Sequence, residues 1–464
     1  MTTPKTFTIR TFGCQMNEHD SERLAGMFVA EGMTPVANES EADLVIFNTC
    51  TIRENADLKL YSALGHVKAL KEANPEMQVA VGGCMAQKDR GKIQEVAGWV
   101  DVVFGTHNIN QAPELLRRAK TEGPLMEIWE APDPEAISEM TPALYAVREL
   151  PYSAWMTIQM GCDNSCAYCI VPSVRGAEIS RPLEVLLTEA RMLADSGVTE
   201  ITVLGQNVNS YGRDITGRSP LFPTLLRSLG EVEGIERIRF TSPHPKDLSS
   251  ETIKAMAETS AVCNHLHLPL QSGSDRVLTG MRRGYHVERY QRILEEARST
   301  IPDLAVTTDL IVGFPGETDA EFEETLKVVA DCSFDLAYTY IFSPREGTRA
   351  ALMGDEFVPD ELVAERFKRL KQVLDRSALS HHEARVGRIE EVLVEGPSRR
   401  NDQMISGRTR QGKLIHFPVT TTPMRAGSMA SVKVTHGAPY HLLGEEVSLL
   451  RGPKHKTRIP LSIS

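Results

Sequence analysis

The sequence lacks the features that would place it in or across a membrane. No apolar run among its 464 residues approaches the length of about 18 residues that a membrane helix needs. Its first residues, MTTPKTFTIR, have no charged start followed by an apolar segment, so we expect no signal peptide. We therefore expect a cytoplasmic protein, in which thiols stay reduced and patterned cysteines indicate metal binding or catalysis rather than disulfides.

The sequence also lacks an overall positive charge and a strong internal repeat. The net charge is −11, with 41% hydrophobic and 24% charged residues, which is ordinary for a globular protein. The length favours two to three domains. The charge is uneven, because residues 361–464 contain 18 Lys and Arg against 10 Asp and Glu. This net of +8 leaves −19 for the first 360 residues, and a basic region on an acidic body predicts a local site for an anionic partner.

Residues 5–122 alternate apolar segments with amphipathic ones. The apolar segments are TFTIRTF, ADLVIFNT, MQVAVGG and WVDVVFG, and stretches such as DSERLAGMFVAEG lie between them. This alternation predicts an α/β domain with a doubly wound parallel sheet. The following run, TEGPLMEIWEAPDPEAISEMTP, has several prolines and no clear period, so we expect a linker there.

Residues 148–380 contain a second strand–helix series with six apolar segments. They are WMTIQMG, EITVLGQN, RIRFTSP, HLHLPLQ, VTTDLIVGF and LAYTYIFSP. Six units are too few for the eight-stranded barrel, so we predict a partial (βα)6 barrel with its ligand at the C-terminal strand ends. Residues 360–386 have the pattern of one long charged helix. Residues 383–449 turn to short strands between Gly and Pro, which predicts a small β-barrel.

The segment GCDNSCAYC places Cys162, Cys166 and Cys169 in a C-x3-C-x2-C pattern after the first strand of the predicted partial barrel. Thiolates are soft ligands that suit zinc or iron–sulfur centres. A structural zinc site usually takes four closed ligands, and no fourth Cys or His lies close by in the sequence. Three thiolates on a [4Fe–4S] cluster leave one iron open for a substrate or cofactor. The alternatives are a zinc site completed from elsewhere and three incidental core cysteines.

Three further cysteines each end a predicted strand of the first domain. Cys14 ends TFTIRTFGC, Cys50 ends LVIFNTC and Cys84 ends VAVGGC, at separations of 36 and 34 residues. Because parallel strands end at the same edge of a sheet, these residues should converge. Three converging thiolates can hold a second [4Fe–4S] cluster, again with one iron open. The alternative is three small buried residues under loops, since free cysteine is often buried.

The remaining cysteines and histidines show no ligand spacing. Cys263 precedes a predicted strand and Cys332 ends a predicted helix, and we expect both to pack in the core. His265 and His267 alternate along one strand and share a face, where we expect them to line the barrel. The HHE segment at 381–383 has the pattern of a solvated helix end.

The C-x3-C-x2-C pattern with Tyr168 before its last cysteine resembles the radical S-adenosylmethionine superfamily. The resemblance implies that the open iron binds the amino and carboxylate groups of S-adenosylmethionine, which an electron cleaves to methionine and a 5′-deoxyadenosyl radical. It also implies cofactor contacts from loops that end successive strands. These would be Gly205, Gln206 and Asn207, then Gln271, Ser272 and Gly273, then Ile311, Val312 and Gly313. For any single glycine, a tight turn is an equally good explanation.

Two three-cysteine sets followed by a small β-barrel resemble the methylthiotransferase family over nearly the whole chain. GCQMNEHDSE and NTCTIRENAD resemble its tRNA-modifying MiaB branch, whereas TSPHP at 241–245 departs from the TSHP expected there. The resemblance implies a methylthiotransferase N-terminal domain, a radical core, a TRAM domain and two [4Fe–4S] clusters. It implies methylthiolation of C2 of N6-(dimethylallyl)adenosine in tRNA, with S-adenosylmethionine as methyl donor and radical source. The alternatives are the same chemistry on a threonylcarbamoyl-adenosine or a ribosomal-protein aspartate, and a zinc-containing RNA-binding protein without catalysis.

Basic residues on the predicted β-barrel favour an RNA partner without the resemblance. They are Arg408, Arg410 and Lys413 on GRTRQGKLIHF, with Arg399, Arg400 and Lys433 nearby. Small β-barrels commonly hold RNA backbone through such residues, and the alternative for each is a solvated surface position. The resemblance to the methylthiotransferases implies the tRNA anticodon stem-loop as partner and an electron donor such as flavodoxin or ferredoxin, and we expect a monomer.

Overall fold

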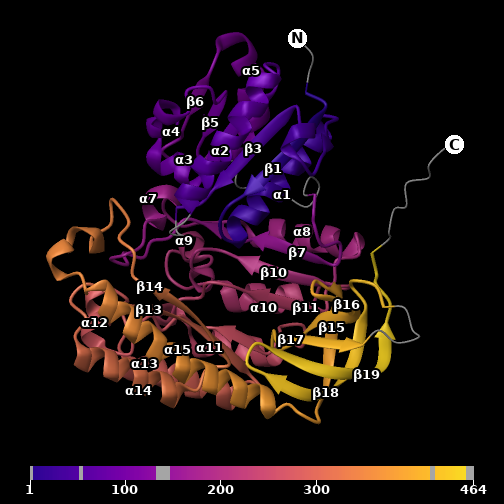
Figure 1. Ribbon diagram of the computed structural model, residues 1–464. Helices are drawn as coiled ribbons and strands as arrows, with labels where there is room; N and C mark the ends of the chain where they lie inside the picture. Colours follow the sequence, from indigo (N-terminus) through magenta and orange to yellow (C-terminus); the bar gives the residue numbers. More distant parts are fainter. Residues whose placement is uncertain (1–3, 52–55, 132–146, 419–423, 456–464) are drawn as a thin grey trace.

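The computed structural model describes residues 4–51, 56–131, 147–418 and 424–455. The chain forms an N-terminal sheet unit, a central strand–helix core and a C-terminal β-barrel (Figure 1). The N-terminal unit lies above the core in that view, and the β-barrel lies against the lower right side of the core. Within these described ranges, no helix combines the length and apolar character needed to cross a membrane.

The N-terminal unit is a parallel sheet with the strand order β2-β1-β3-β4-β5-β6. Its strands are β1 Thr6–Thr11, β2 Thr34–Pro35, β3 Leu44–Thr49, β4 Gln78–Gly83, β5 Val102–Phe104 and β6 Leu125–Glu127. Every residue of β3 and β4 is buried, as expected where helices cover both faces of a parallel sheet. Alternate residues enter two different cores, since Val45 and Phe47 pack in one and Leu44 and Ile46 in the other.

Helices cover both faces of this sheet, which confirms the predicted doubly wound arrangement. One face carries α1 Gln15–Ala30 and α5 Ala112–Glu122, and the other carries α2 Ala56–Ala73, α3 Cys84–Asp89 and α4 Gly91–Val96. The predicted linker was wrong at its start, because Leu125–Glu127 forms β6 and pairs with β5. Three residues are too few to show a strand period. Residues 132–146 of that linker, and residues 52–55 of NTCTIRENAD, lie outside the described residues.

The core has the six parallel strands that the sequence predicts. They are β7 Ser153–Thr157, β10 Glu200–Leu204, β11 Arg237–Phe240, β12 His265–His267, β13 Ala305–Val312 and β14 Leu336–Ile341. They form two sheets, β7-β10-β11 and β12-β13-β14, joined by a parallel bridge from Ile238 to Val262. The outer helices are α8 Leu183–Asp195, α10 Phe222–Gly230, α11 Ser250–Glu258, α13 Val287–Thr300 and α14 Asp319–Cys332. The result is an open partial barrel.

The C-terminal part begins with the long helix α15, Asp360–Glu383, which packs against β14 and α14. A closed β-barrel follows in the order β15-β16-β17-β19-β18. Its strands are β15 Ile389–Ser398, β16 Asn401–Thr409, β17 Leu414–Pro418, β18 Met429–Ala438 and β19 His441–Arg451. Alternate apolar residues such as Val392 and Val394 fill its interior, because strand side chains alternate between faces. The predicted segment MISGRTRQGKLIHF is a hairpin, with its turn at residues 410–413.

Candidate functional site

The first cysteine set lies at the C-terminal edge of the N-terminal sheet. Cys14 follows β1 and is the N-cap of α1, Cys50 follows β3, and Cys84 follows β4 as the first residue of α3. These three strands are neighbours in the sheet, so their ends lie side by side. A side chain at Gly13 would lie 2.7 Å from the Cβ of Cys50, which shows how closely the loops approach.

The thiols of this set differ in their ease of ionisation. The pKa of Cys14 is lowered to about 5, mainly by its hydrogen bond with Cys50. Burial opposes this shift, and the positive charge of Arg175 adds to it. Burial raises the pKa of Cys84, although the nearby positive charge of Arg175 opposes this shift. The Cys14–Cys50 pair therefore presents a thiolate near neutral pH, and the thiolate is the form that binds metal.

In iron-free protein near pH 7, iodoacetamide should modify Cys14 much faster than Cys162 or Cys169. Burial is the main cause that raises the pKa of Cys162 to about 11 and that of Cys169 to about 12, so both remain thiols when Cys14 is a thiolate. Peptide mass spectrometry across a pH series would give the rates. The rate at Cys14 should rise through about pH 5 and then level off, and a rise confined to the region of pH 9 would contradict this assignment.

The second cysteine set lies on the loop between β8, Gln159–Met160, and α7, Val171–Arg175. The Cys162 N–H donates to the carbonyl of Gly176 at 3.0 Å, and the Cys169 N–H donates to the carbonyl of Cys166 at 3.1 Å. The loop therefore starts and ends in fixed positions at the C-terminal ends of the core strands, which is the usual ligand side of such barrels.

The chemistry of this second set fits an iron–sulfur cluster. Cys166 Sγ accepts a hydrogen bond from Arg283 Nη1 at 3.3 Å. The three thiols are close enough that a charge on Cys166 opposes ionisation of both Cys162 and Cys169. Ionising all three thiols together is costly without a bound cation, so the set suits a metal centre that thiolates bind.

The short helix α7 joins the two cysteine sets. It starts two residues after Cys169, and Ile170 and Val174 are buried against Cys84. At its end, Arg175 Nη2 donates to Asp20 Oδ2 of α1 at 2.9 Å. Figure 1 shows α7 where the N-terminal unit meets the core. The two sets are therefore neighbours across one interface between units.

The loop after β10 offers unpaired polar atoms for a cofactor. Gln206 Oε1 and Asn207 Oδ1 are buried and have no hydrogen-bond partner among the described residues. The same holds for Gln159 Oε1 and His244 Nε2 on neighbouring segments. Buried acceptors without partners are costly, and amide oxygens are suitable acceptors for an ammonium group. Gln206 and Asn207 thus fit the amino group of S-adenosylmethionine, as the resemblance implied.

The other predicted cofactor loops are less open. Ser272 Oγ lies 3.3 Å from Thr325 Oγ1 of α14, and a side chain at Gly273 would lie 2.6 Å from the Thr325 Cα. Val312 is buried in the core between strands and helices, and a side chain at Gly313 would collide with Val363 of α15. These four positions allow helices to pack closely against the strand ends.

Two of the remaining predicted cofactor positions have a distinctive backbone. Gln271 adopts a φ of 70° and is 7% exposed, and its N–H donates to the carbonyl of Asp309 at 2.8 Å. Gly205 lies so close to Gln159 that an added Cβ would be 3.0 Å from its Cγ. Both residues fix the shape of the strand ends, and Gly205 does so beside the unpaired amides.

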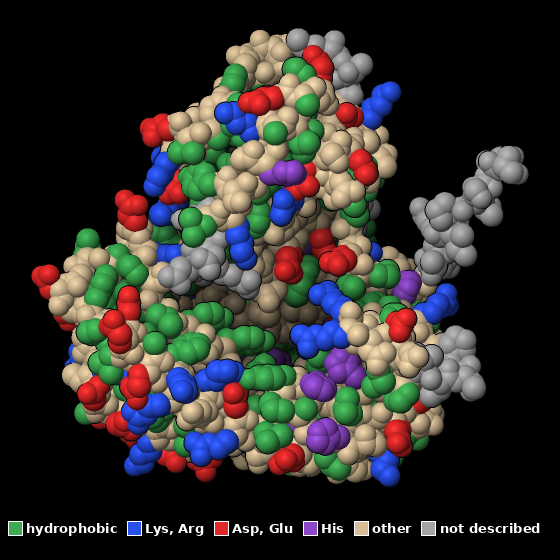
Figure 2. Space-filling view, in the orientation of Figure 1, with side chains coloured by type: hydrophobic (Ala, Val, Ile, Leu, Met, Phe, Trp, Pro, Cys, Tyr) green, Lys and Arg blue, Asp and Glu red, His purple; other side chains and the backbone are tan. Residues whose placement is uncertain are grey.

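Figure 2 shows a hollow between the N-terminal unit above and the core and β-barrel below. Lys and Arg side chains gather along its right edge, above the β-barrel, and His side chains lie on the β-barrel below them. His265 and His267, predicted as core or barrel-lining residues, are half-buried and both contact Thr307 Oγ1 on β13, at 3.1 and 3.0 Å. A hollow with a basic edge is suited to a polyanionic substrate.

The hairpin that carries the predicted RNA-binding residues is docked on the core. Arg410 donates to the carbonyls of Ser260 at 2.6 Å and Val262 at 2.9 Å. In return, Arg239 of β11 donates to the carbonyls of Thr409 and Arg410. Arg408 is exposed and donates to Glu395 Oε1 at 2.7 Å. Arg410 is thus committed to the contact between units, whereas Arg408 remains at the surface.

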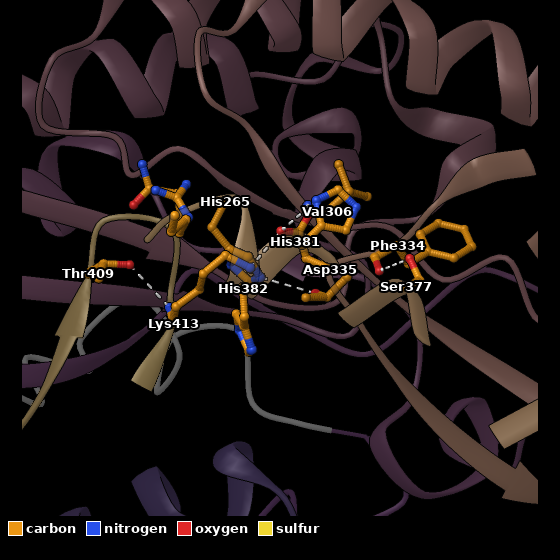
Figure 3. Close-up of polar contacts among 12 residues, drawn as sticks. His265, Val306, Phe334, Asp335, Ser377, His381, His382, Thr409 and Lys413 are labelled. Carbon is orange, nitrogen blue, oxygen red and sulfur yellow. Dashed lines mark hydrogen bonds and ion pairs between the residues drawn. The ribbon is translucent and has the colours of Figure 1, made fainter. Parts of the chain in front are cut away.

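Lys413 lies inside that contact rather than on an RNA surface. It is 6% exposed, and its Nζ lies 2.6 Å from Asp335 Oδ1, next to the start of β14 (Figure 3). Burial opposes ionisation of Asp335, but the charges of Lys413 and His381 outweigh it and lower the pKa of Asp335. The sequence prediction is therefore corrected at Lys413, because the docked hairpin turns this side chain inward.

The helix end at 381–383 is also buried in part, contrary to the predicted solvated end. His382 is 5% exposed and its Nδ1 lies 2.6 Å from the carbonyl of Ala438 in β18. His381 Nε2 lies 2.9 Å from the carbonyl of Ser333. The β-barrel covers this end of α15, which the sequence period could not reveal. Cys263 and Cys332 are 2% and 3% exposed, which confirms core packing for both.

Three residues near the cysteines were missed by the sequence argument. Arg175 contacts the first set, Arg283 contacts the second, and His244 lies in the TSPHP loop with an unpaired buried nitrogen. An arginine in a loop or short helix usually indicates a solvated position. Only the fold reveals that these arginines are buried beside thiols. His244 stays neutral, because burial and the Arg283 charge lower its pKa to about 2.

Comparison with known families and proteins divides the chain into three parts. Residues 6–105 match the uncharacterized protein family UPF0004, residues 156–329 the radical SAM superfamily, and residues 383–447 the TRAM domain. A tRNA-2-methylthio-N(6)-dimethylallyladenosine synthase of Thermobifida fusca is 49% identical over 96% of this chain and 90% of its own length. A protein of the same name from Mycobacterium bovis is 48% identical over 95% of this chain and 87% of its own length.

A likeness to solved structures extends to the fold. The radical S-adenosylmethionine methyltransferase TsrM from Kitasatospora setae, solved with cobalamin and a [4Fe-4S] cluster bound, has a TM-score of 0.56. It is 14% identical, and the match covers 75% of this chain and 77% of TsrM. The predicted arrangement of a parallel-sheet domain before a radical SAM core is therefore supported as a fold.

Proposed function

Because the chain belongs to the family of tRNA-2-methylthio-N(6)-dimethylallyladenosine synthases, we propose that it methylthiolates C2 of N6-(dimethylallyl)adenosine in tRNA, next to the anticodon. The observation that carries the proposal is the pair of three-cysteine sets that α7 holds at one interface. One set alone supports only a radical enzyme. Two incomplete sets side by side separate the delivery of sulfur from the generation of a radical.

With a [4Fe–4S] cluster on each cysteine set and S-adenosylmethionine at the second, the bound groups supply the methylthio group and the radical that an unreactive aromatic C–H requires. Cys14, Cys50 and Cys84 provide the thiolates of the first set. Cys162, Cys166 and Cys169 provide those of the second.

Polar side chains of the core complete the second site. Arg283 donates to Cys166 at 3.3 Å and so withdraws charge from that sulfur. Gln206 and Asn207 would orient the cofactor, because their unpaired amide oxygens could accept from its ammonium group. The N-terminal unit lies over this side of the core (Figure 1).

The substrate would enter the hollow beside the β-barrel. Arg399, Arg400, Arg408 and Lys433 are exposed on the β-barrel and would hold the phosphates of the anticodon stem-loop. A one-electron carrier such as flavodoxin or ferredoxin would reduce the second cluster. The enzyme would act as a monomer, since each chain contains both cysteine sets and the β-barrel.

Loss of the gene should remove 2-methylthio-N6-dimethylallyladenosine from cellular tRNA and leave the unthiolated nucleoside in its place. Mass spectrometry of nucleosides from a deletion strain measures both species. Re-expression of the parent chain should restore the product, and re-expression of the Cys50→Ala variant should not. Persistence of the methylthio nucleoside at its normal level in the deletion strain would refute the proposal.

Anaerobically reconstituted protein should be brown and contain about eight irons per chain, because each of two [4Fe–4S] clusters holds four. Iron and sulfide analysis measures this directly. Changing Cys162, Cys166 and Cys169 together to Ala should halve the iron content, as should the corresponding change of Cys14, Cys50 and Cys84. Colourless protein that contains zinc alone would refute the enzymatic function.

A further inference from the structure

A buried arginine of the core contacts the cysteine set of the N-terminal unit. Arg175 is 4% exposed and ends α7, six residues after Cys169. Val174, the residue before it, is buried against Cys84, so the Arg175 charge lies close enough to favour the Cys84 thiolate, and its Nη2 donates to Asp20 Oδ2 at 2.9 Å. The chain segment that contains the second cysteine set therefore also places the positive charge of Arg175 beside the first set.

Residues of the N-terminal unit hold Arg175 and α7 in place at the interface. Asp20 is 4% exposed and lies on α1, six residues after Cys14, so it reaches Arg175 from the first set. Thr106 Oγ1 donates to the carbonyl of Val174 at 2.5 Å, which fixes α7 against the N-terminal unit. A planar guanidinium has donors enough to serve a carboxylate and a thiolate together, which a lysine does less well.

The second cysteine set has a matching partner. Arg283 is 6% exposed and donates to Cys166. Each set thus has one of its thiols beside a buried guanidinium. Hydrogen bonds and positive charge at cluster sulfurs favour the reduced, more negative state of the cluster. Water screens such a charge little when it is buried.

We propose that Arg175 is a positioning residue for the N-terminal cluster, and that its buried positive charge beside Cys84 raises the reduction potential of that cluster. Because Arg175 belongs to the core, the reduction potential of the N-terminal cluster depends on contact between the two units. A sulfur ligand on the open iron would add negative charge to the cluster. The same positive charge that raises the reduction potential would stabilise this added charge. The inference rests on the proposed function in one respect, which is that Cys14, Cys50 and Cys84 hold an iron–sulfur cluster.

The test uses the full-length chain with Cys162, Cys166 and Cys169 changed to Ala, so that the N-terminal cluster alone gives a signal. Into this background we would place Arg175→Met, Arg175→Lys or Arg283→Met. The last is a matched control, since it removes a buried arginine beside the vacated second set. Each protein is reconstituted with iron and sulfide, its iron is counted, and its midpoint potential is measured by redox titration with electron paramagnetic resonance.

Arg175→Met should shift the midpoint potential to a more negative value than that of the background. Arg175→Lys should shift it less, and Arg283→Met should leave it unchanged. An unchanged potential in an iron-loaded Arg175→Met protein would overturn the inference and leave the proposed function intact. If Arg175→Met cannot hold iron, retention by Arg175→Lys supports the role of the charge, and equal loss in both overturns it. A background protein without iron would overturn the proposed function as well.

Discussion

Changing Cys50 to alanine should reduce methylthio transfer by more than about a hundredfold while S-adenosylmethionine is still cleaved to 5′-deoxyadenosine. Changes beside a metal site already cost up to about a hundredfold, and Cys50 is proposed as a direct ligand. It follows directly after β3, and its side chain contacts that of Cys14 in the first set. Chromatography with mass spectrometry measures 5′-deoxyadenosine and the methylthio nucleoside in one sample.

The matched control for Cys50 is Cys332→Ala, because Cys332 is likewise a buried cysteine but lies at the end of α14, in neither set. This control should retain both reactions. If Cys50→Ala abolished cofactor cleavage while the second set kept its iron, the division of labour between the sets would be wrong. Equal losses in both variants would instead indicate a general effect of a core cavity.

Changing Lys413 to methionine should destabilise the docked β-barrel by about 3 to 5 kcal/mol, because it removes the lysine charge that compensates the buried carboxylate of Asp335. The two side chains are each 6% exposed and 2.6 Å apart, so little water can replace the lost charge. Urea denaturation of the full-length protein, with the shift of the transition midpoint compared between variants, measures the effect.

The double variant Lys413→Met with Asp335→Leu provides the control for this prediction. Replacing both charges with apolar groups removes the unpaired carboxylate, and such exchanges are often neutral or stabilising. The double variant should therefore recover most of the stability. Arg408→Met, which changes an exposed residue of the same hairpin, should have little effect. Full stability of the Lys413→Met protein would refute the structural role assigned to this ion pair.

Local patterns were sufficient for most of the architecture. The alternation of apolar and amphipathic segments predicted the doubly wound sheet, and the count of six βα units predicted the open barrel, because both depend on short-range periods. The strand-end positions of Cys14, Cys50 and Cys84 predicted their convergence from topology alone. Shorter elements, such as β6 at Leu125–Glu127, were not predicted, because three residues are too few to show the period of a strand.

The sequence by itself determined which residues we propose as cluster ligands, namely two sets of three cysteines, because ligand type and spacing follow the chain. Only the tertiary structure decided how those sets meet and which charges surround them. Arg175 and Lys413 are both basic residues that a sequence assigns to solvent by default, yet packing between units buries the first beside Cys84 and the second beside Asp335. Burial of a charge is set by partners distant in the sequence, so no local pattern could reveal it.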